Sequence, residues 1–258
     1  MIAKKSFGQH FLQDKSVIRK IIAAAEIVPG ETVLEIGPGH GVLTEALVDA
    51  GARVVAIEAD RDLIPELKEK FGDRIELISG DALRLNDSTT QRLNDYKLVA
   101  NLPYNIASAV LEKFLSAEHP PTRLVVMVQK EVAERILAKP GEMSVLSVAC
   151  QLYADVKRVC NVPPGAFRPV PKIHSAVVRM DVGLGARGLK MEYDPELVIG
   201  LAKLGFRSRR KQLHGNLSSR FDGTLVKQCL REMGLSEKAR AQELSVEEWV
   251  GLAERLVI

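Results

Sequence analysis

The chain has 258 residues, of which 46% are hydrophobic and 27% are charged, and its formal net charge is +3. This size suits one large domain or a domain with a small appendage, and no apolar run approaches the roughly 18 residues that span a bilayer. The mildly basic balance permits an acidic partner such as nucleic acid without requiring one. Residues 1–6 lack an apolar segment, so we expect no signal peptide and a cytoplasmic protein.

The three cysteines, Cys150, Cys160 and Cys229, lie far apart and form no CxxC pair. This spacing argues against a zinc site and against a disulfide framework, and it fits a reducing compartment. We therefore expect no bound metal.

Apolar residues at helical spacing predict a first helix that is capped by Ser16 and ended by Pro29 and Gly30. Short β-branched runs then alternate with helical segments. The predicted strands are 32–36, 53–57, 74–78, 97–100 and 123–128, and the predicted helices are 42–50, 60–71, 108–115 and 131–139. This alternation predicts an α/β fold with a mostly parallel sheet, helices on both faces, and ligands at the carboxyl ends of the strands.

The remainder of the chain has a different pattern. The predicted elements are a helix and a strand within 145–162, a proline-rich loop at 163–172, a last strand at 175–180, a linker at 183–188, and helices at 195–206, 224–233 and 246–256. The sequence therefore predicts a first domain at 1–182 and a small all-helical domain at 189–258. We expect the single tryptophan, Trp249, in the core of the helical domain.

Three predicted strand ends carry residues suited to a nucleoside. Gly37, Gly39 and Gly41 form a GxGxG turn that lets backbone amides approach a ligand. Glu58 is placed to accept both hydroxyls of a ribose, and Asp81 to accept from an adenine amine. The alternatives are a solvated carboxylate and a simple turn aspartate. Together these residues describe a site for an adenosine whose tail is not a phosphate, and the short glycine spacing disfavours NAD.

The segment Asn101-Leu102-Pro103-Tyr104 ends the predicted fourth strand. The Asn101 oxygen and the Leu102 carbonyl could accept the hydrogens of an exocyclic amine, Pro103 would fix the turn, and Tyr104 would stack on a flat base. The alternative is a strand-to-loop turn with a buried tyrosine. Phe167, in the proline-rich loop, could close the other face of the base or be a core aromatic.

In this order, these motifs resemble the S-adenosylmethionine-dependent adenine-N6 methyltransferases. The segments 7–12, 129–132, 163–175 and 206–217 are similar to those of the KsgA-type ribosomal RNA adenine dimethyltransferases, and the resemblance runs from about residue 4 to about residue 255. It implies a Rossmann-like class I methyltransferase sheet, S-adenosylmethionine as methyl donor, and dimethylation at N6 of two adjacent adenosines near the 3′ end of small-subunit ribosomal RNA. It also implies that 1–182 is the catalytic domain and 189–258 the RNA-binding domain.

Carried over residue by residue, the resemblance implies two overlapping sets of site residues. The methyl donor would contact His10, Leu12, Gly37, Gly39, Glu58, Asp81 and Asn101, and catalysis would involve Asn101, Leu102, Pro103, Tyr104 and Phe167. His10 stands where the family usually has asparagine, and its backbone could still serve the donor.

Four cations follow the first helix of the helical domain: Arg207, Arg209, Arg210 and Lys211. We expect them to bind RNA phosphates, and the alternative is a solvated charged face. The expected partner is small-subunit ribosomal RNA within a 30S precursor, with no membrane, and the expected state is a monomer. Three other functions stay open: a large-subunit adenine dimethyltransferase of the antibiotic-resistance type, a non-catalytic assembly factor or nucleic-acid-binding protein, and a DNA adenine methyltransferase.

Overall fold

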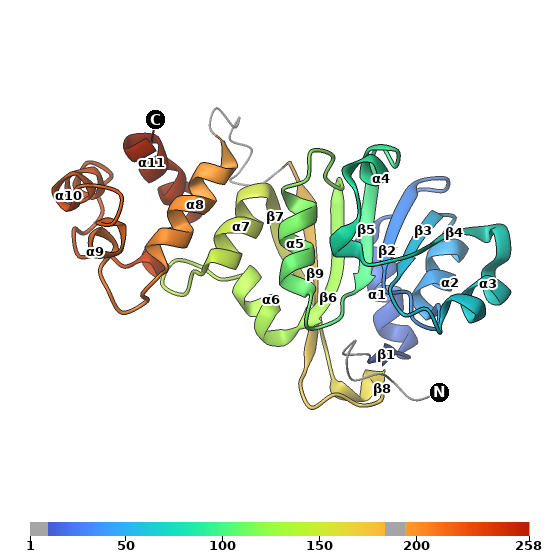
Figure 1. Ribbon diagram of the computed structural model, residues 1–258. Coiled ribbons are helices and arrows are strands. Elements are labelled where there is room, and N and C mark those ends of the chain that lie inside the picture. The colour runs from blue at the N-terminus through green and yellow to red at the C-terminus, as the bar shows by residue number, and fades with distance from the viewer. Residues whose placement is uncertain (1–9, 184–193, 258) are drawn as a thin grey trace. The chain divides into compact units, whose positions relative to one another are not determined.

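The computed structural model describes residues 10–183 and 194–257, which fall into two compact units (Figure 1). The first unit holds the described residues up to Ala133 together with Val156–Gly183. The second holds Glu134–Asp155 and the described residues from 194 onward. Residues 7–9 of the N-terminal motif and 184–188 of the predicted linker lie outside the described residues.

The first unit is built on a seven-stranded sheet with the order β4-β3-β2-β5-β6-β9-β7. Its strands are β2 (Thr32–Ile36), β3 (Arg53–Glu58), β4 (Ile75–Ser79), β5 (Tyr96–Asn101), β6 (Arg123–Gln129), β7 (Ala154–Val162) and β9 (Ser175–Val182). From β4 to β6 all neighbouring strands are parallel, whereas β9 runs antiparallel to β6. The structure thus confirms the predicted mostly parallel sheet and places each predicted strand within two residues of its expected bounds.

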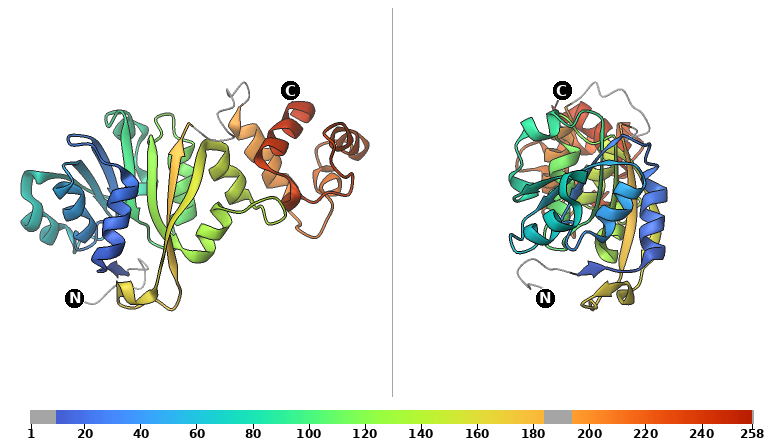
Figure 2. Two further views of the ribbon diagram at one scale, coloured as in Figure 1. Left: turned by 180° about the vertical axis from the view of Figure 1, so that it is seen from behind. Right: turned by 90° about the vertical axis from the view of Figure 1, so that its right-hand side faces the viewer.

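Helices cover both faces of this sheet, with α5 in front of it and α1 behind it (Figures 1 and 2). The helices that follow the early strands are α1 (Lys15–Ala25), α2 (Val42–Asp49), α3 (Ile64–Phe71), α4 (Asp87–Gln91), α5 (Ala107–Leu115) and α6 (Lys130–Ile136). Several predicted helix bounds were wrong: α1 ends at Ala25, before Pro29, and α6 ends three residues earlier than predicted. Asp14, not Ser16, caps α1, because its carboxylate accepts the Ser16 amide at 2.7 Å. Helix α3 starts four residues later than predicted, which puts Pro65 in its first turn.

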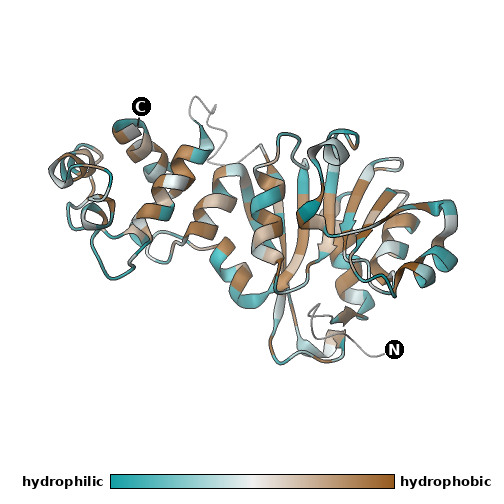
Figure 3. Cartoon of the chain, viewed as in Figure 1, coloured by the Kyte–Doolittle hydropathy of each residue, from teal (hydrophilic) through white to brown (hydrophobic). Residues whose placement is uncertain are grey.

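The central strands are apolar on both faces, as expected for a sheet buried between two layers of helices (Figure 3). On one face, Val33, Val54 and Val99 pack in a cluster with residues of α1 and α2, and each is at most 1% exposed. On the other face, Leu34 and Leu98 have no exposed surface. This two-sided burial fixes the strand ends that carry the candidate ligand residues.

Short elements complete the first unit. Strand β1 (Phe11–Leu12) pairs antiparallel with β8 (Phe167–Arg168), so that Leu12 lies opposite Phe167. In the described residues, the single-turn helices are η2 (Gly72–Arg74), η3 (Ala82–Arg84), η4 (Pro164–Ala166) and, in the second unit, η6 (Ala241–Glu243). None of the described helices is both long and apolar enough to cross a membrane.

Apart from the first two residues of β7, the regular structure described in the second unit is helical. It contains α7 (Val145–Tyr153), α8 (Pro195–Gly205), α9 (Leu213–Leu217), α10 (Gly223–Glu232) and α11 (Val246–Val257). Trp249 has no exposed surface and lies in the core of this unit, as predicted. Helix α7 adds Val148 and Leu152 to the same core. The helical unit therefore includes 134–155 as well as the C-terminal segment, which differs from the division predicted at residue 182.

Candidate active site

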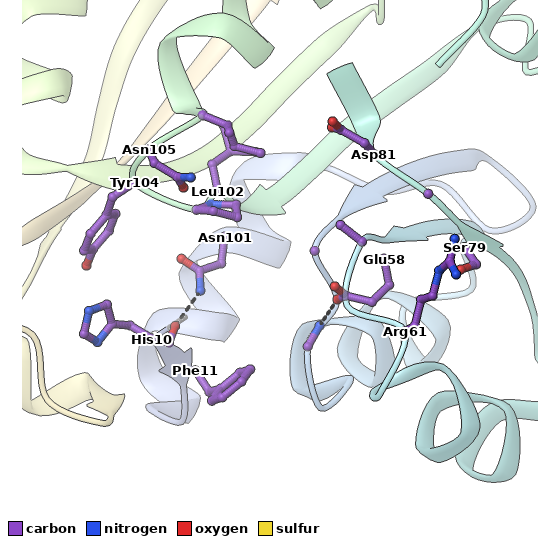
Figure 4. Close-up of a pocket in the computed structure, with 16 residues that line it drawn as sticks. His10, Phe11, Glu58, Arg61, Ser79, Asp81, Asn101, Leu102, Tyr104 and Asn105 are labelled. Atoms are coloured by element: carbon purple, nitrogen blue, oxygen red, sulfur yellow. Dashed lines mark hydrogen bonds between the residues drawn. The ribbon is translucent and has the colours of Figure 1, made fainter. Parts of the chain in front are cut away.

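The strand order places a crevice between β2 and β5. From β2 the chain proceeds outward to β3 and β4, and it then returns to β5 on the other side of β2. Ligands of such sheets bind outside the carboxyl ends of the strands at this switch point. A cavity of ≈ 490 Å³ lies there, lined by side chains or backbone that include Gly37, Glu58, Asp81 and Asn101 (Figure 4). Its volume falls within the range of about 300–1,000 Å³ typical of small-molecule sites.

The glycine turn after β2 needs its glycines for two different reasons. Gly37 and Gly39 line the cavity, with φ of 68° and 59°. A Cβ at Gly39 would lie 2.9 Å from the Phe11 ring, so a side chain there would collide with one wall of the cavity. A Cβ at Gly41 would lie 2.3 Å from the Phe71 ring. Gly41 therefore serves the packing of α3, while the first two glycines keep backbone open to a ligand.

Glu58 ends β3 and is 6% exposed. Its Oε2 accepts the Gly39 amide at 3.1 Å and its Oε1 accepts the Asp60 amide at 2.8 Å, so the carboxylate is held in one orientation beside the cavity. Burial raises the pKa of Glu58, and these two hydrogen bonds oppose the shift. A carboxylate offers about four lone-pair sites, so it can still accept two hydroxyl groups of a ligand.

Asp81 also lines the cavity and caps η3. Its Oδ1 accepts the Leu83 amide at 2.9 Å, and the Nε of Arg84 lies 3.8 Å from its Oδ2. Asp81 is therefore a turn aspartate that also borders the cavity, and its contact with an adenine amine stays a prediction.

The Asn101 side chain, at the end of β5, lines the cavity that Glu58 and Asp81 also border (Figure 4). Its Nδ2 donates to the backbone carbonyl of His10 at 3.1 Å. Because a carbonyl only accepts, this bond fixes which half of the amide faces His10 and leaves the oxygen as an acceptor turned elsewhere. No residue that the structure describes donates a hydrogen bond to that oxygen.

The backbone after Asn101 is fixed from both sides. The amide of Leu102 donates to the Met127 carbonyl of β6 at 3.1 Å. The ring of Pro103 lies 3.8 Å from the position that a Cβ on Gly37 would occupy. The turn of the acceptor segment thus packs directly against the glycine turn, and both Leu102 and Pro103 border the cavity.

Tyr104 also lines the cavity, and its ring is held at two points. The hydroxyl lies 2.9 Å from the Ser175 hydroxyl at the start of β9. The ring stacks on the imidazole of His10, with centroids 5.5 Å apart and planes inclined by 29°. Burial raises the pKa of the Tyr104 phenol, and the Ser175 hydrogen bond lowers it. His10 is itself anchored, because its Nδ1 lies 2.8 Å from the Pro169 carbonyl.

The structure does not place Phe167 at the cavity, and Leu12 lines only a small second pocket that also borders Gly37, Gly39 and Asn101. Phe167 has no exposed surface, Leu12 is 5% exposed, and both belong to the core cluster behind the glycine turn. Phe167 is therefore the core aromatic of the two sequence-based alternatives, since the β1–β8 pairing turns it inward. Sequence reasoning missed Arg61 and Asn105, which also line the cavity; Asn105 directly follows the acceptor segment, whereas nothing in the sequence singled out Arg61.

Glu35, in the middle of β2, is an ionisable group with 1% of its surface exposed. Its Oε2 has no hydrogen-bond partner among the described residues. Burial raises the pKa of Glu35 to about 8; the nearby Thr44 hydroxyl opposes the shift, and the charge of Glu58 adds to it. The carboxyl is therefore mostly neutral at pH 7.

The predicted basic cluster lies in the second unit, on the loop between α8 and α9. Arg207, Arg209, Arg210 and Lys211 are all exposed, and none forms an ion pair with a carboxylate in the described part of the chain. The buried amide of Asn216 holds this loop, because its Nδ2 donates to the carbonyls of Gly205 and Ser208 at 2.5 and 3.0 Å. The loop thus presents unpaired positive charge from a fixed backbone.

Comparison with known proteins decides the family. A family model described as "Ribosomal RNA adenine dimethylase" matches residues 2–257. The chain belongs to this family. It is 43% identical to the ribosomal RNA small subunit methyltransferase A of Thermosynechococcus vestitus over 98% of this chain and 97% of that protein. It is 44% identical to the protein of that name in Syntrophotalea carbinolica, over 97% of this chain and 96% of the relative.

Solved structures agree with this assignment. The 23S rRNA methyltransferase ErmE superposes with a TM-score of 0.76 at 29% identity and covers 95% of this chain and 99% of its own. A dimethyladenosine transferase from Plasmodium falciparum superposes with a TM-score of 0.79 at 28% identity, over 94% and 96%. The comparisons confirm the predicted class I methyltransferase fold. They also confirm the predicted enzyme class, an S-adenosylmethionine-dependent ribosomal RNA methyltransferase.

Proposed function

We propose that the protein transfers methyl groups from S-adenosylmethionine to N6 of two adjacent adenosines in the 3′-terminal hairpin loop of small-subunit ribosomal RNA. The small-subunit assignment is supported by relatives of that name at 43 and 44% identity, against 29% for the large-subunit enzyme ErmE. The large-subunit reaction is the second candidate, because ErmE matches nearly the whole chain in three dimensions.

The cavity fits the methyl donor. Glu58, held by two backbone amides, would accept the ribose hydroxyls, and Asp81 would accept from the adenine amine. The open backbone at Gly37 and Gly39 leaves room for the amino-acid tail, and the His10 backbone adds polar atoms beside it. When bound, S-adenosylmethionine supplies an electrophilic methyl group on a sulfonium.

The acceptor site is the Asn101 segment, and the orientation of the Asn101 amide is the observation that carries the proposal. The N6 lone pair of adenine is delocalised into the ring, so the amine is a poor nucleophile. Two acceptors, the Asn101 oxygen and the Leu102 carbonyl, would bind the two N6 hydrogens and localise that lone pair toward the methyl group. Tyr104 offers the stacking face. No charged general base is required, because the amine proton becomes acidic only after methylation, and positioning is the main catalytic effect.

The second unit would bind the RNA backbone through Arg207, Arg209, Arg210 and Lys211. Their exposure and the fixed backbone of the loop support this role. We expect the protein to act as a monomer in the cytoplasm, on a precursor of the small subunit. A role in subunit biogenesis fits such a substrate.

The test is methyl transfer to purified ribosomal particles. Small and large subunits from cells that lack this gene are incubated with the protein and labelled S-adenosylmethionine, and the modified nucleotides are located by mass spectrometry. We expect dimethyladenosine at two adjacent positions of the small-subunit RNA alone. Label in the large subunit would favour the second candidate, and failure to bind S-adenosylmethionine would indicate a non-catalytic assembly factor.

A further inference from the structure

Two exposed apolar side chains stand on the loop between β8 and β9. Val170 is 53% exposed and Ile173 is 43% exposed. The other exposed large hydrophobic residues in the described part of the chain are Val28 and Leu225, which lie in two different segments. Single exposed apolar residues are ordinary on protein surfaces, whereas Val170 and Ile173 lie within four residues of one loop, and clustered exposed apolar side chains mark interaction sites.

This loop is held in place beside the cavity. At its start, the Pro169 carbonyl accepts from His10, whose ring and backbone border the cavity. At its end, the His174 carbonyl accepts the Lys130 amide at 2.9 Å. Ser175, which follows, pairs with Gln129 at the carboxyl end of β6, so the loop leaves the sheet at the edge where the ligand cavity lies (Figure 1).

The charge of the loop indicates its partner. Arg168, Lys172 and His174 are exposed beside the two apolar residues, and residues 163–174 contain no aspartate or glutamate. A surface that joins apolar side chains to cations matches unpaired RNA, which presents base faces between phosphates. Protein partners of such a loop would need a matching acidic rim, whereas RNA supplies negative charge at every nucleotide.

We propose that Val170 and Ile173 form an RNA-unstacking surface, with Arg168 and Lys172 on the flanking phosphates. This inference rests on the proposed function. An adenine stacked in a hairpin loop cannot place its N6 against Asn101, so the target base must leave the stack. Apolar side chains that pack on the neighbouring base replace the lost stacking contact, as wedges of Ile, Leu or Phe do in other nucleic-acid complexes.

The experiment compares methyl transfer to undermethylated small subunits by two double variants and one single variant. V170S/I173S removes the apolar surface, V170I/I173V keeps it, and V28S changes the valine that is 62% exposed between α1 and β2, at the opposite edge of the sheet. We expect kcat/KM to fall about tenfold or more in V170S/I173S. The other two variants should stay within about twofold of the wild type, with donor affinity and unfolding midpoint unchanged in all three.

The inference is overturned if V170S/I173S methylates the particles as fast as V28S does, or if V170I/I173V loses as much activity as the serine variant. Cosedimentation with anionic vesicles that depends on Val170 and Ile173, together with unchanged transfer kinetics, would overturn it too and point to a membrane surface. An inactive wild type would instead contradict the proposed function itself.

Discussion

Glu35 offers a prediction whose size follows from its surroundings. Its carboxyl is buried in β2, and its pKa is raised to about 8 from an ordinary value of 4.5. Because the folded protein holds the proton more tightly than the unfolded chain does, the group favours the folded state below pH 4.5. That contribution is lost as the pH rises from 4.5 through 8. Replacing the carboxyl with a neutral amide of the same shape, in E35Q, removes this pH dependence.

The magnitude follows from about 1.4 kcal/mol for each pKa unit. Ionisation of Glu35 then lowers the free energy of unfolding by less than about 1 kcal/mol at pH 5, by roughly 3 kcal/mol at pH 7 and by roughly 5 kcal/mol at pH 9. The free energy of unfolding of E35Q minus that of the wild type should therefore increase by these amounts between pH 5 and pH 9. Any change in packing caused by the amide adds a contribution that does not depend on pH.

Urea unfolding at the three pH values, followed by circular dichroism, measures this difference. E69Q serves as the control, since Glu69 is an exposed carboxylate on α3 of the same unit. Its stability relative to the wild type should change little between pH 5 and pH 9. A stability difference between E35Q and the wild type that is the same at all three pH values would refute the reasoning.

Three further predictions concern the site and the basic loop. Ser175→Ala and Tyr104→Phe remove the same hydrogen bond, so the double variant should lose no more kcat than the more impaired single variant. Additive losses of kcat would instead show that the two hydroxyls act independently. Phe167→Ala should lower the free energy of unfolding by about 3–5 kcal/mol, because the ring is fully buried; an unchanged urea midpoint with lost transfer would restore the stacking role. Asn216→Ala should weaken RNA binding at low salt without changing donor affinity, as measured by filter binding, and unchanged RNA affinity would remove the loop from the interface.

Much of the fold could be predicted because local patterns determine it. Five apolar runs separated by amphipathic segments specify a two-sided buried sheet, and the structure places those strands as expected. The switch point then brings Gly37 and Asn101 together, although 64 positions of chain separate them. Residue types at strand ends therefore predicted that Gly37, Glu58, Asp81 and Asn101 share one cavity.

The parts that sequence could not predict depend on long-range packing. Helix α7 reads as a continuation of the α/β pattern, yet Val148 and Leu152 join the core of the helical unit. Phe167 is compatible with a core or a stacking role until its pairing with Leu12 is known. His10 shows the same limit, since its contacts with Tyr104 and Pro169 join segments more than 90 residues away in the sequence.

The central claim is that the Asn101 oxygen binds the adenine amine during transfer. Two variants test this claim: N101A, and N101D, which keeps an oxygen acceptor but loses the amide group that donates to the His10 carbonyl. Single-turnover methylation of small subunits measures the transfer rate, and calorimetric titration measures the affinity for S-adenosylmethionine. We predict that N101A loses roughly 10²–10³-fold in transfer rate while it binds S-adenosylmethionine nearly as tightly as the wild type, and that N101D retains more activity than N101A. Equal losses of transfer and of donor affinity in N101A would contradict the account.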